Sequence, residues 1–264
     1  MNIYQVVQSE EKMAQLIVEN ITKKYDGITM LQDISLYVGE NEIVSLLGAS
    51  GVGKTTLFHI IAGVEIPDMG NIYYDNEEVT GETGKFSYML QKDLLFSHKT
   101  ILDNVSLPFQ LCGESKKQAH EKAKSYFGEF GLDGTQDKYP YQLSGGMKQR
   151  AAFLRTFLYG TTKQTEGNLF LLDEPFSALD ALTKKELQQW YRKQVEKYNL
   201  STLFITHDID EAILLSDRIY ILGGRPAKIC EEIVVERQNK GEENFELTEQ
   251  FLDYKKKIMN WLTK

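Results

Sequence analysis

Cysteine is scarce in this sequence, and positive charge does not predominate. The 264 residues include two cysteines, Cys112 and Cys230, which lie far apart in the chain. This number and spacing exclude a disulfide framework and a compact zinc site, and they fit a reducing cytosol. The formal net charge of −8 argues against a broad nucleic-acid-binding surface, because neutralising a phosphate backbone requires clustered Lys and Arg. We therefore expect no nucleic-acid partner.

Long apolar runs are also absent. No stretch approaches the roughly 20 residues that a helix needs to cross a bilayer, and residues 1–15 lack the basic start and apolar centre of a secretory signal. Any membrane role is therefore expected to come through a partner. The composition, 42% apolar and 26% charged, is that of a globular protein. A chain of this length suits one domain with an embedded subdomain better than two independent domains.

The most informative stretch is a glycine-rich segment at residues 48–56, which reads Gly-Ala-Ser-Gly-Val-Gly-Lys-Thr-Thr and matches the P-loop pattern. Its glycines let successive backbone amides point at one anion at the start of a helix. Lys54 adds a cation for terminal phosphates, and the Thr55 hydroxyl can ligate Mg²⁺. The candidate nucleotide-binding residues here are Gly48, Ala49, Ser50, Gly51, Val52, Gly53, Lys54, Thr55 and Thr56. The alternative, a glycine-rich turn with a chance lysine, does not explain why an apolar strand pattern (42–47) precedes the segment and a helix pattern (56–62) follows it.

The remaining patterns indicate an α/β fold. Residues 16–22 suggest an edge strand, and residues 34–38 and 71–74 suggest further strands around the P-loop. From about residue 93 to 159 the sequence becomes helical and charged. Strand patterns then return at residues 168–172, 201–206, 218–222 and 229–235, alternating at first with helices, as in a parallel sheet. Ligands gather at the carboxyl ends of such strands, where Lys54, Asp173 and His207 are expected.

A resemblance to a known family rests on the order of the motifs. Leu-Ser-Gly-Gly at residues 143–146 follows the P-loop and precedes Asp-Glu-Pro at residues 173–175. Over roughly residues 16–235 the chain resembles the ATP-binding subunit of an ATP-binding cassette (ABC) transporter. Residues 91–96, 99–105 and 139–150 resemble most the importers of the nitrate, sulfonate and taurine type, which are themselves similar to importers of thiamine-precursor pyrimidines.

This resemblance implies a P-loop NTPase with a RecA-like, mainly parallel core, an antiparallel β subdomain and an inserted helical subdomain at about residues 93–159. Residues 1–15 would be an N-terminal extension, and residues 236–264 a linker and an amphipathic helix. The apolar face of that helix, formed by Phe251, Tyr254, Ile258 and Leu262, is expected to pack on its own domain.

The resemblance also implies roles for single residues. Tyr25 resembles the aromatic residue that stacks on adenine; a turn tyrosine that shields the sheet edge is the alternative. Asp173 resembles the carboxylate that holds Mg²⁺, and Glu174 the general base that orients the attacking water. Paired acids at a strand end are otherwise often a helix cap or a solvated turn. The catalytic residues that the resemblance implies are Lys54 and Glu174, together with Gln91 and His207.

Two further residues complete the implied site. His207 resembles the switch histidine that contacts the γ-phosphate, although a lone histidine after an apolar strand is usually structural. Gln91 resembles the residue that senses Mg²⁺ and the water, beside the groove in which a permease docks. The implied metal ligands are Thr55, Gln91 and Asp173, and the implied cofactors are ATP and Mg²⁺.

Ser144, Gly145 and Gly146 resemble the signature that completes the ATP site of a second subunit. Two such subunits close head to tail on ATP and reopen after hydrolysis. The resemblance therefore implies an ATPase of the translocase class that acts as a two-fold dimer, either a homodimer, which we expect, or a pair with a related subunit. It would lie peripherally on the cytoplasmic face of the cell membrane, bound to a multi-spanning permease and indirectly served by an extracytoplasmic solute-binding protein. The expected cargo is a small polar solute.

Some features depart from the family pattern. Ser97 and His98 replace a common Pro-Trp pair, which weakens the assignment to the nitrate and taurine group; Asn41 replaces a usual glycine, with no expected functional loss. Residues 159–167 suggest a surface insertion. The alternatives to an importer are an exporter or lipoprotein-release ATPase, a soluble ABC ATPase acting in DNA repair or translation, and a regulatory module without activity.

Overall fold

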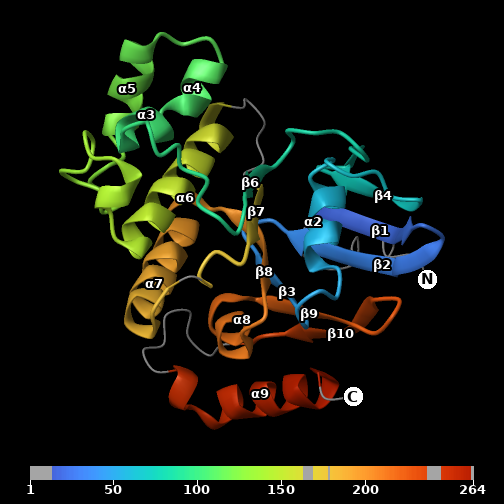
Figure 1. Cartoon of the computed structure of the whole chain (residues 1–264). Helices are drawn as coiled ribbons and strands as arrows, with labels where there is room; N and C mark the ends of the chain where they lie inside the picture. Colours follow the sequence, from blue (N-terminus) through green and yellow to red (C-terminus); the bar gives the residue numbers. More distant parts are fainter. Residues whose placement is uncertain (1–13, 163–168, 178, 237–244, 263–264) are drawn as a thin grey trace. The chain divides into compact units, whose positions relative to one another are not determined.

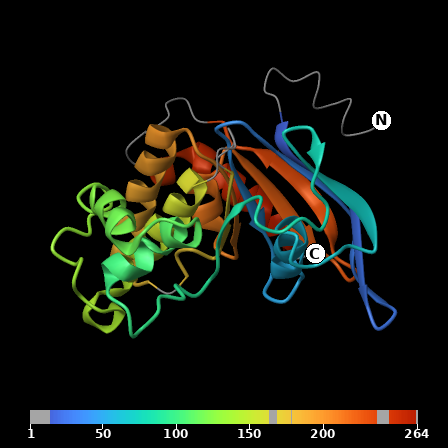
Figure 2. The same ribbon diagram turned by 90° about the horizontal axis from the view of Figure 1, so that it is seen from above.

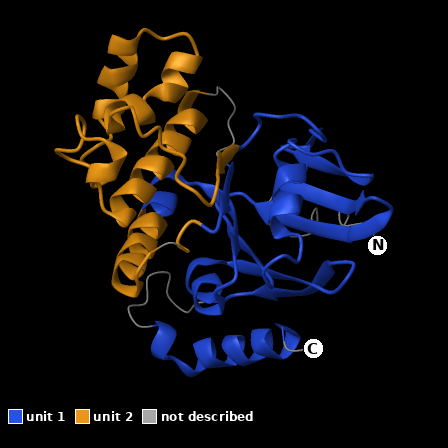
Figure 3. Ribbon diagram, in the orientation of Figure 1, with its two compact units in different colours: residues 1–86, 169–174, 194–264 blue, residues 87–168, 175–193 orange. Residues whose placement is uncertain are grey.

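The structure, a computed structural model, describes residues 14–162, 169–177, 179–236 and 245–262. These residues divide into two compact units, shown in separate colours in Figure 3. Unit 1 takes its described residues from 1–86, 169–174 and 194–264, and unit 2 from 87–168 and 175–193. The expected N-terminal extension, residues 1–15, lies almost wholly outside the described residues, and so does most of the expected insertion at residues 159–167.

The larger sheet of unit 1 is mainly parallel, as predicted. Five of its strands lie in the order β10, β9, β3, β8, β7, and only β10 runs antiparallel to its neighbour (Figure 1). The strands are β3 (Ile43–Leu47), β7 (Leu169–Asp173), β8 (Ser201–Thr206), β9 (Arg218–Gly223) and β10 (Lys228–Val234). Every residue of β3, β7 and β8 is buried, which is why these strands read as continuous apolar runs. The helices α2 (Lys54–Ile61) and α8 (Ile209–Leu215) follow β3 and β8.

The smaller sheet of unit 1 is antiparallel, with the strand order β2, β1, β4, β5; Figure 1 labels β1, β2 and β4. Its strands are β1 (Ala14–Tyr25), β2 (Ile28–Gly39), β4 (Met69–Tyr74) and β5 (Glu77–Glu78). The prediction of an edge strand at residues 16–22 was wrong, because β1 pairs with both β2 and β4. Leu16, Val18 and Ile21 are fully buried, as an interior strand requires. The polar Asn20 lies where the pairing register shifts, and its φ is 52°.

Unit 2 is largely helical. It contains β6 (Ser87–Met89), α3 (Ile101–Val105), α4 (Leu107–Leu111), α5 (Lys116–Lys124), η1 (Pro140–Gln142), α6 (Gly145–Thr162) and the first part of α7 (Ala181–Tyr198). An aromatic cluster forms its core, in which Phe130 lies 6.1 Å from Phe153 and 5.5 Å from Trp190 between ring centroids. The segment at 93–159, expected to be a helical subdomain, lies in this unit.

The C-terminal helix α9 (Glu249–Leu262) packs against α8 and β9 within unit 1 (Figures 1 and 2). Phe251 and Ile258 are buried in a core that includes Ile219 and Ile221, and Tyr254 is packed against it. Lys255 forms an ion pair of 2.7 Å with Asp210. Phe251, Tyr254 and Ile258 therefore pack on unit 1 as expected, whereas Leu262, expected on the same face, is 38% exposed. A short 3₁₀ helix, η2 (Phe245–Leu247), precedes it.

Candidate active site

The loop between β3 and α2 has a shape that only glycine permits at two of its positions. Gly53 has φ +112°, and a Cβ atom there would lie 2.7 Å from Leu31 Cδ2. A Cβ at Gly48 would lie 2.5 Å from the carbonyl oxygen of Leu222. Residues 49–51, at the tip of the loop, are exposed. The loop is therefore pressed against its neighbours at both ends and open to solvent between them.

Lys54, the first residue of α2, is held inside this loop. Only 5% of the residue is exposed. Its Nζ donates to the carbonyl oxygens of Gly48, at 2.7 Å, and Ala49, at 2.9 Å. Burial lowers the pKa of Lys54, and the nearby carboxyls of Glu174 and Asp173 oppose that shift. The ammonium is thus aimed at the loop interior, where it can neutralise an anion.

Asp173 ends β7 and faces the start of α2. Its carboxylate accepts a hydrogen bond of 3.3 Å from the Thr55 hydroxyl, and the residue is 5% exposed. Burial raises the pKa of Asp173; Glu174 raises it further, while the Thr55 hydrogen bond lowers it.

Together, these oxygens fit Mg²⁺. A hydroxyl and a carboxylate are hard ligands, and Mg²⁺ is usually bound by one or two carboxylates together with substrate phosphates and water. Among the described residues, no group of three or more His, Cys, Asp or Glu side chains could hold a metal. Thr55 and Asp173 would therefore hold Mg²⁺ only as part of a complex with phosphate.

Glu174 and His207 form a second pair at the same edge of the sheet. Glu174 follows β7 in the left-handed backbone region, with φ 46°, and its N–H donates to the Ile205 carbonyl at 3.1 Å. Its Oε1 lies 3.1 Å from His207 Nδ1. An uncommon backbone conformation that neighbouring strands hold in place is frequent at functional sites. The arrangement sets a carboxylate and an imidazole beside the phosphate loop, where they can orient and polarise water.

The loop that carries His207 is fixed by its neighbour. Asp208 caps α8 by accepting hydrogen bonds from the N–H groups of Asp210, at 2.9 Å, and Glu211, at 3.2 Å. The Asp208 N–H in turn donates to the Thr206 hydroxyl at 3.0 Å. His207 is therefore set between the end of β8 and the start of α8.

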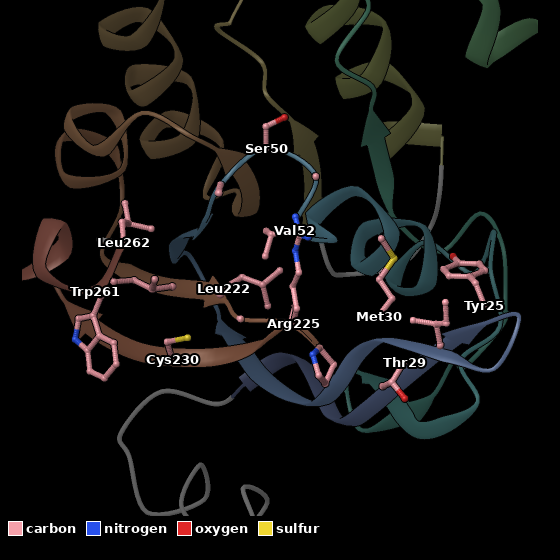
Figure 4. Close-up of a pocket in the computed structure, with 18 of the residues that line it drawn as sticks. Tyr25, Thr29, Met30, Ser50, Val52, Leu222, Arg225, Cys230, Trp261 and Leu262 are labelled. Atoms are coloured by element: carbon pink, nitrogen blue, oxygen red, sulfur yellow. The ribbon is translucent and has the colours of Figure 1, made fainter. Parts of the chain in front are cut away.

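A cavity of about 940 Å³ adjoins the tip of the phosphate loop (Figure 4). Tyr25, Thr29 and Met30 lie on one side of it, and Cys230, Trp261 and Leu262 lie on the opposite side, with Arg225 between them. Residues 49–52 of the loop also line it. Its volume suits a small-molecule ligand. Tyr25, which is 41% exposed, offers the cavity an aromatic ring.

Gln91 belongs to unit 2, in an irregular segment that follows β6, and it is exposed. Two side chains fix this segment. Arg155 donates to the carbonyls of Asp93 and Leu94 at 2.7 and 2.8 Å. The fully buried Asn104 accepts from the Phe96 N–H at 2.7 Å and donates to the Phe96 carbonyl at 3.1 Å.

The signature residues also belong to unit 2, at the start of α6. The Ser144 hydroxyl accepts from the Met147 N–H at 3.3 Å, and the helix proper begins at Gly145. Ser144 and Gly145 are exposed, whereas Gly146 is buried. A Cβ at Gly146 would lie 2.8 Å from Thr183 Cγ2 on α7, so this helix start is packed closely on one side. Its exposed N–H groups can bind an anion.

Unit 1 thus brings together Lys54, Thr55, Asp173, Glu174 and His207, and places Tyr25 on the adjoining cavity. Sequence reasoning missed three supporting residues: Glu65, which accepts a hydrogen bond from Tyr25, and Arg155 and Asn104, which fix the Gln91 segment. Asn104 and Gln91 lie in two segments, 99–105 and 91–96, that both carry the family resemblance, and this shared signal could have suggested their link. Glu65 lies 40 residues from Tyr25 in sequence, and no local pattern marks it.

Comparisons with known proteins agree with this geometry. Residues 31–177 match the family model described as ABC transporter. The chain is 45% identical to the formylaminopyrimidine import ATP-binding protein ThiZ of Halalkalibacterium halodurans, over 83% of this chain and 84% of that protein. It is 36% identical to the sulfate/thiosulfate import ATP-binding protein CysA of the same organism, over 82% of this chain and 63% of that protein. Among solved structures, a dimeric ATP-binding cassette in a post-hydrolysis state, bound to ADP and Pi, superposes with a TM-score of 0.70 at 27% identity, over 84% of this chain and 99% of that chain.

Proposed function

The chain belongs to the ABC transporter family, and we propose that it is the ATP-hydrolysing, energy-coupling subunit of an importer of a small polar solute. Proteins of this family bind ATP with Mg²⁺ and hydrolyse it to drive transport. The observation that carries the proposal is the constellation in unit 1, in which Lys54 lies inside the loop and Thr55 and Asp173 lie 3.3 Å apart. Beside them, Glu174 and His207 lie 3.1 Å apart.

In this proposal each side chain has one task. The amides of residues 48–56 and Lys54 bind the phosphates, and Thr55 and Asp173, with Gln91, hold Mg²⁺. When bound, Mg²⁺ neutralises charge that develops on the phosphates. Glu174 orients and polarises the attacking water, and His207 keeps the carboxylate in place and contacts the terminal phosphate. Tyr25 stacks on the adenine. The protein contributes positioning and electrostatic stabilisation, the main requirements of phosphoryl transfer.

The second half of the site comes from another subunit. Ser144, Gly145 and Gly146 would complete the ATP site of the partner, so that ATP closes a two-fold dimer and hydrolysis lets it reopen. Support comes from the exposed start of α6 and from the dimeric state of the cassette bound to ADP and Pi. Because one chain carries both half-sites, we propose a homodimer.

Transport requires a membrane partner. Among the residues that the structure describes, no helix has the length and apolarity to cross a bilayer. We propose that the chain docks peripherally on the cytoplasmic face of a multi-spanning permease, to which an extracytoplasmic solute-binding protein delivers the cargo. Residues 16–235 would form the ATPase domain, with the helical subdomain inserted at about 93–159. Residues 236–264 would form a linker and a packing helix.

The cargo that we favour is a thiamine-precursor pyrimidine. The relative named for formylaminopyrimidine import is 45% identical and is covered over 84% of its length, whereas the relative named for sulfate and thiosulfate import is 36% identical and is covered over 63%. Import of nitrate, sulfonate or taurine is the alternative within the same group of importers.

Partner capture tests the proposal. The Glu174→Gln variant, tagged at the N-terminus and extracted from membranes in a mild detergent with ATP and Mg²⁺, should co-purify with a multi-spanning permease that mass spectrometry identifies. Lys54→Ala provides the matched control, because it should bind ATP poorly. Recovery of soluble partners alone, with the chain absent from the membrane fraction, would overturn the transporter function in favour of a soluble ATPase.

A further inference from the structure

Tyr25, the last residue of β1, is held by a segment far away in the sequence. Its phenol O–H donates to Glu65 Oε1 at 2.5 Å. The Lys23 Nζ lies over the Tyr25 ring, 5.3 Å from its centroid, and donates to the Ile66 carbonyl at 2.7 Å. Glu65 and Ile66 therefore fix both the phenol and the cation that lies over the ring.

This segment is the direct continuation of the phosphate-binding helix. The N–H groups of Val64 and Glu65 both donate to the carbonyl of His59, in the last turn of α2, at 2.9 and 3.1 Å. The N-terminus of α2 is the phosphate loop itself, beginning at Lys54. One short helix therefore carries the phosphate site at its start and the residues that hold Tyr25 just after its end.

The segment is also fixed to β1. Asp68 Oδ2 accepts from the Lys24 N–H at 2.6 Å, and the Asp68 N–H donates to the Thr22 carbonyl at 2.9 Å. Glu65 is half-buried, so its carboxylate is less exposed to water than a surface acid would be. A hydrogen bond to an ionised carboxylate is stronger than one between neutral groups.

The ring faces are therefore not equivalent. Lys23 lies over one face, which leaves the other face for an adenine base. Tyr25 also lines the cavity together with residues 49–52 (Figure 4). Burial and the neighbouring Glu65 raise the pKa of Tyr25, so the phenol stays protonated and can donate to the carboxylate.

We propose that Glu65 is a positioning residue for nucleotide binding: it holds the Tyr25 ring in the orientation that receives the base and ties this orientation to the helix that binds the phosphates. The inference rests on the proposed function, because it takes adenine as the group that stacks on Tyr25. Glu65 does not line the cavity itself and acts through Tyr25.

The test compares ligands with and without a base. Glu65→Ala should weaken binding of a fluorescent ATP analogue by about five- to tenfold. A loss of this size is part of the binding free energy of one base–aromatic stack. Binding of inorganic tripolyphosphate, measured by competition, should stay within about twofold, because α2 and the loop are intact. In steady-state hydrolysis KM for ATP should rise while kcat changes little. Glu65→Gln, which keeps an acceptor without the charge, should fall between Glu65→Ala and the natural protein.

A double-mutant cycle ties the effect to the phenol. Tyr25→Phe should weaken ATP binding to a similar extent, and Glu65→Ala combined with Tyr25→Phe should be no weaker than either change alone. Glu78→Ala, an exposed glutamate on β5 of the same unit, is the matched control and should leave both ligands unaffected.

The outcomes separate the two hypotheses. Failure of the natural protein to bind the ATP analogue would overturn the proposed function. Two results would overturn the role of Glu65 and leave the proposed function standing. In the first, the natural protein binds the ATP analogue, but Glu65→Ala binds it as tightly as Glu78→Ala does. In the second, the effects of Glu65→Ala and Tyr25→Phe on ATP binding are additive. An equal loss of ATP and tripolyphosphate binding would also overturn this role, since that would mean the change disturbs α2 rather than Tyr25.

Discussion

Two helix starts in this chain can bind anions, and they are built differently. The start of α2 holds a buried lysine, and Thr55 on α2 is hydrogen-bonded to the buried Asp173. The start of α6 presents a serine hydroxyl and N–H groups at an exposed surface. A charged, enclosed site can bind phosphate within a single chain, whereas an exposed set of neutral donors binds well only a ligand that is already held elsewhere. The difference fits the proposal that one chain supplies two unlike halves of a shared site.

The largest expected effect is a loss of ATP hydrolysis at the enclosed site, with ATP still bound there. Glu174→Gln should lower kcat for ATP hydrolysis by roughly 10²- to 10⁴-fold, the range for loss of a general base. ATP binding should persist, so the variant should form a stable dimer by size-exclusion chromatography with ATP. Glu40→Gln, an exposed glutamate of unit 1, is the control. Unchanged turnover in Glu174→Gln would contradict the role assigned to Glu174.

A smaller effect breaks the exposed half-site instead. Gly146→Ala puts a methyl group 2.8 Å from Thr183 Cγ2, so either the Thr183 side chain or the start of α6 must shift. Overpacking typically costs about 1–3 kcal/mol of stability. If a cost of this size falls on closure of the dimer, hydrolysis should fall roughly tenfold, and the Glu174→Gln dimer should be lost when both changes are combined. Fluorescent ATP should still bind to the single chain as in the natural protein.

Thr183→Ser supplies the control for this change, because it removes the methyl group in question and keeps the hydroxyl. When Thr183→Ser is combined with Gly146→Ala, most of the ATP hydrolysis rate should return. Thr183→Ser alone should leave the rate unchanged. Should Gly146→Ala weaken ATP binding by the isolated chain as much as Lys54→Ala does, the two helix starts would not be separate half-sites.

The smallest effect sharpens the comparison through stability. Asp173→Asn should raise the Tm by roughly 2–4 °C at pH 7.5, because a buried carboxylate is replaced by a neutral amide that can still accept from Thr55. Burial raises the pKa of Asp173 above its ordinary value of 3.8, so the folded natural protein binds this proton more tightly than the unfolded chain. Its stability relative to Asp173→Asn is therefore greatest below about pH 4 and falls as the pH rises through the raised pKa.

Denaturant unfolding at pH 4.0 and 7.5 measures this difference. The free energy of unfolding of Asp173→Asn should exceed that of the natural protein by more at pH 7.5 than at pH 4.0. A gap that narrows with rising pH would mean that Asp173 is stabilised as a carboxylate. Ser144→Ala, at the exposed helix start, should show no pH-dependent gap.

The features predicted best from the sequence are those that depend on residues adjacent in the chain. The phosphate loop occupies nine consecutive positions, and β3, β7 and β8 are apolar because both of their faces are covered. The contacts that the sequence could not predict join distant segments. Pairing of β1 with β4 depends on residues more than 45 positions apart, and this pairing makes β1 an interior strand. The bond from Tyr25 to Glu65 depends in the same way on where the chain emerges from α2.

The positions of the two cysteines make them suitable for labelling with dyes. Cys112 is exposed at the end of α4 in unit 2, and Cys230 is a partly exposed residue of β10 on the cavity wall in unit 1. The sequence contains no other thiol. The unaltered chain therefore offers one dye attachment point in each unit, with Cys112 the faster to react. A donor and acceptor pair on these two sulfurs would turn any ATP-driven change in the separation of the units into a change in energy transfer, read on single molecules without a substitution.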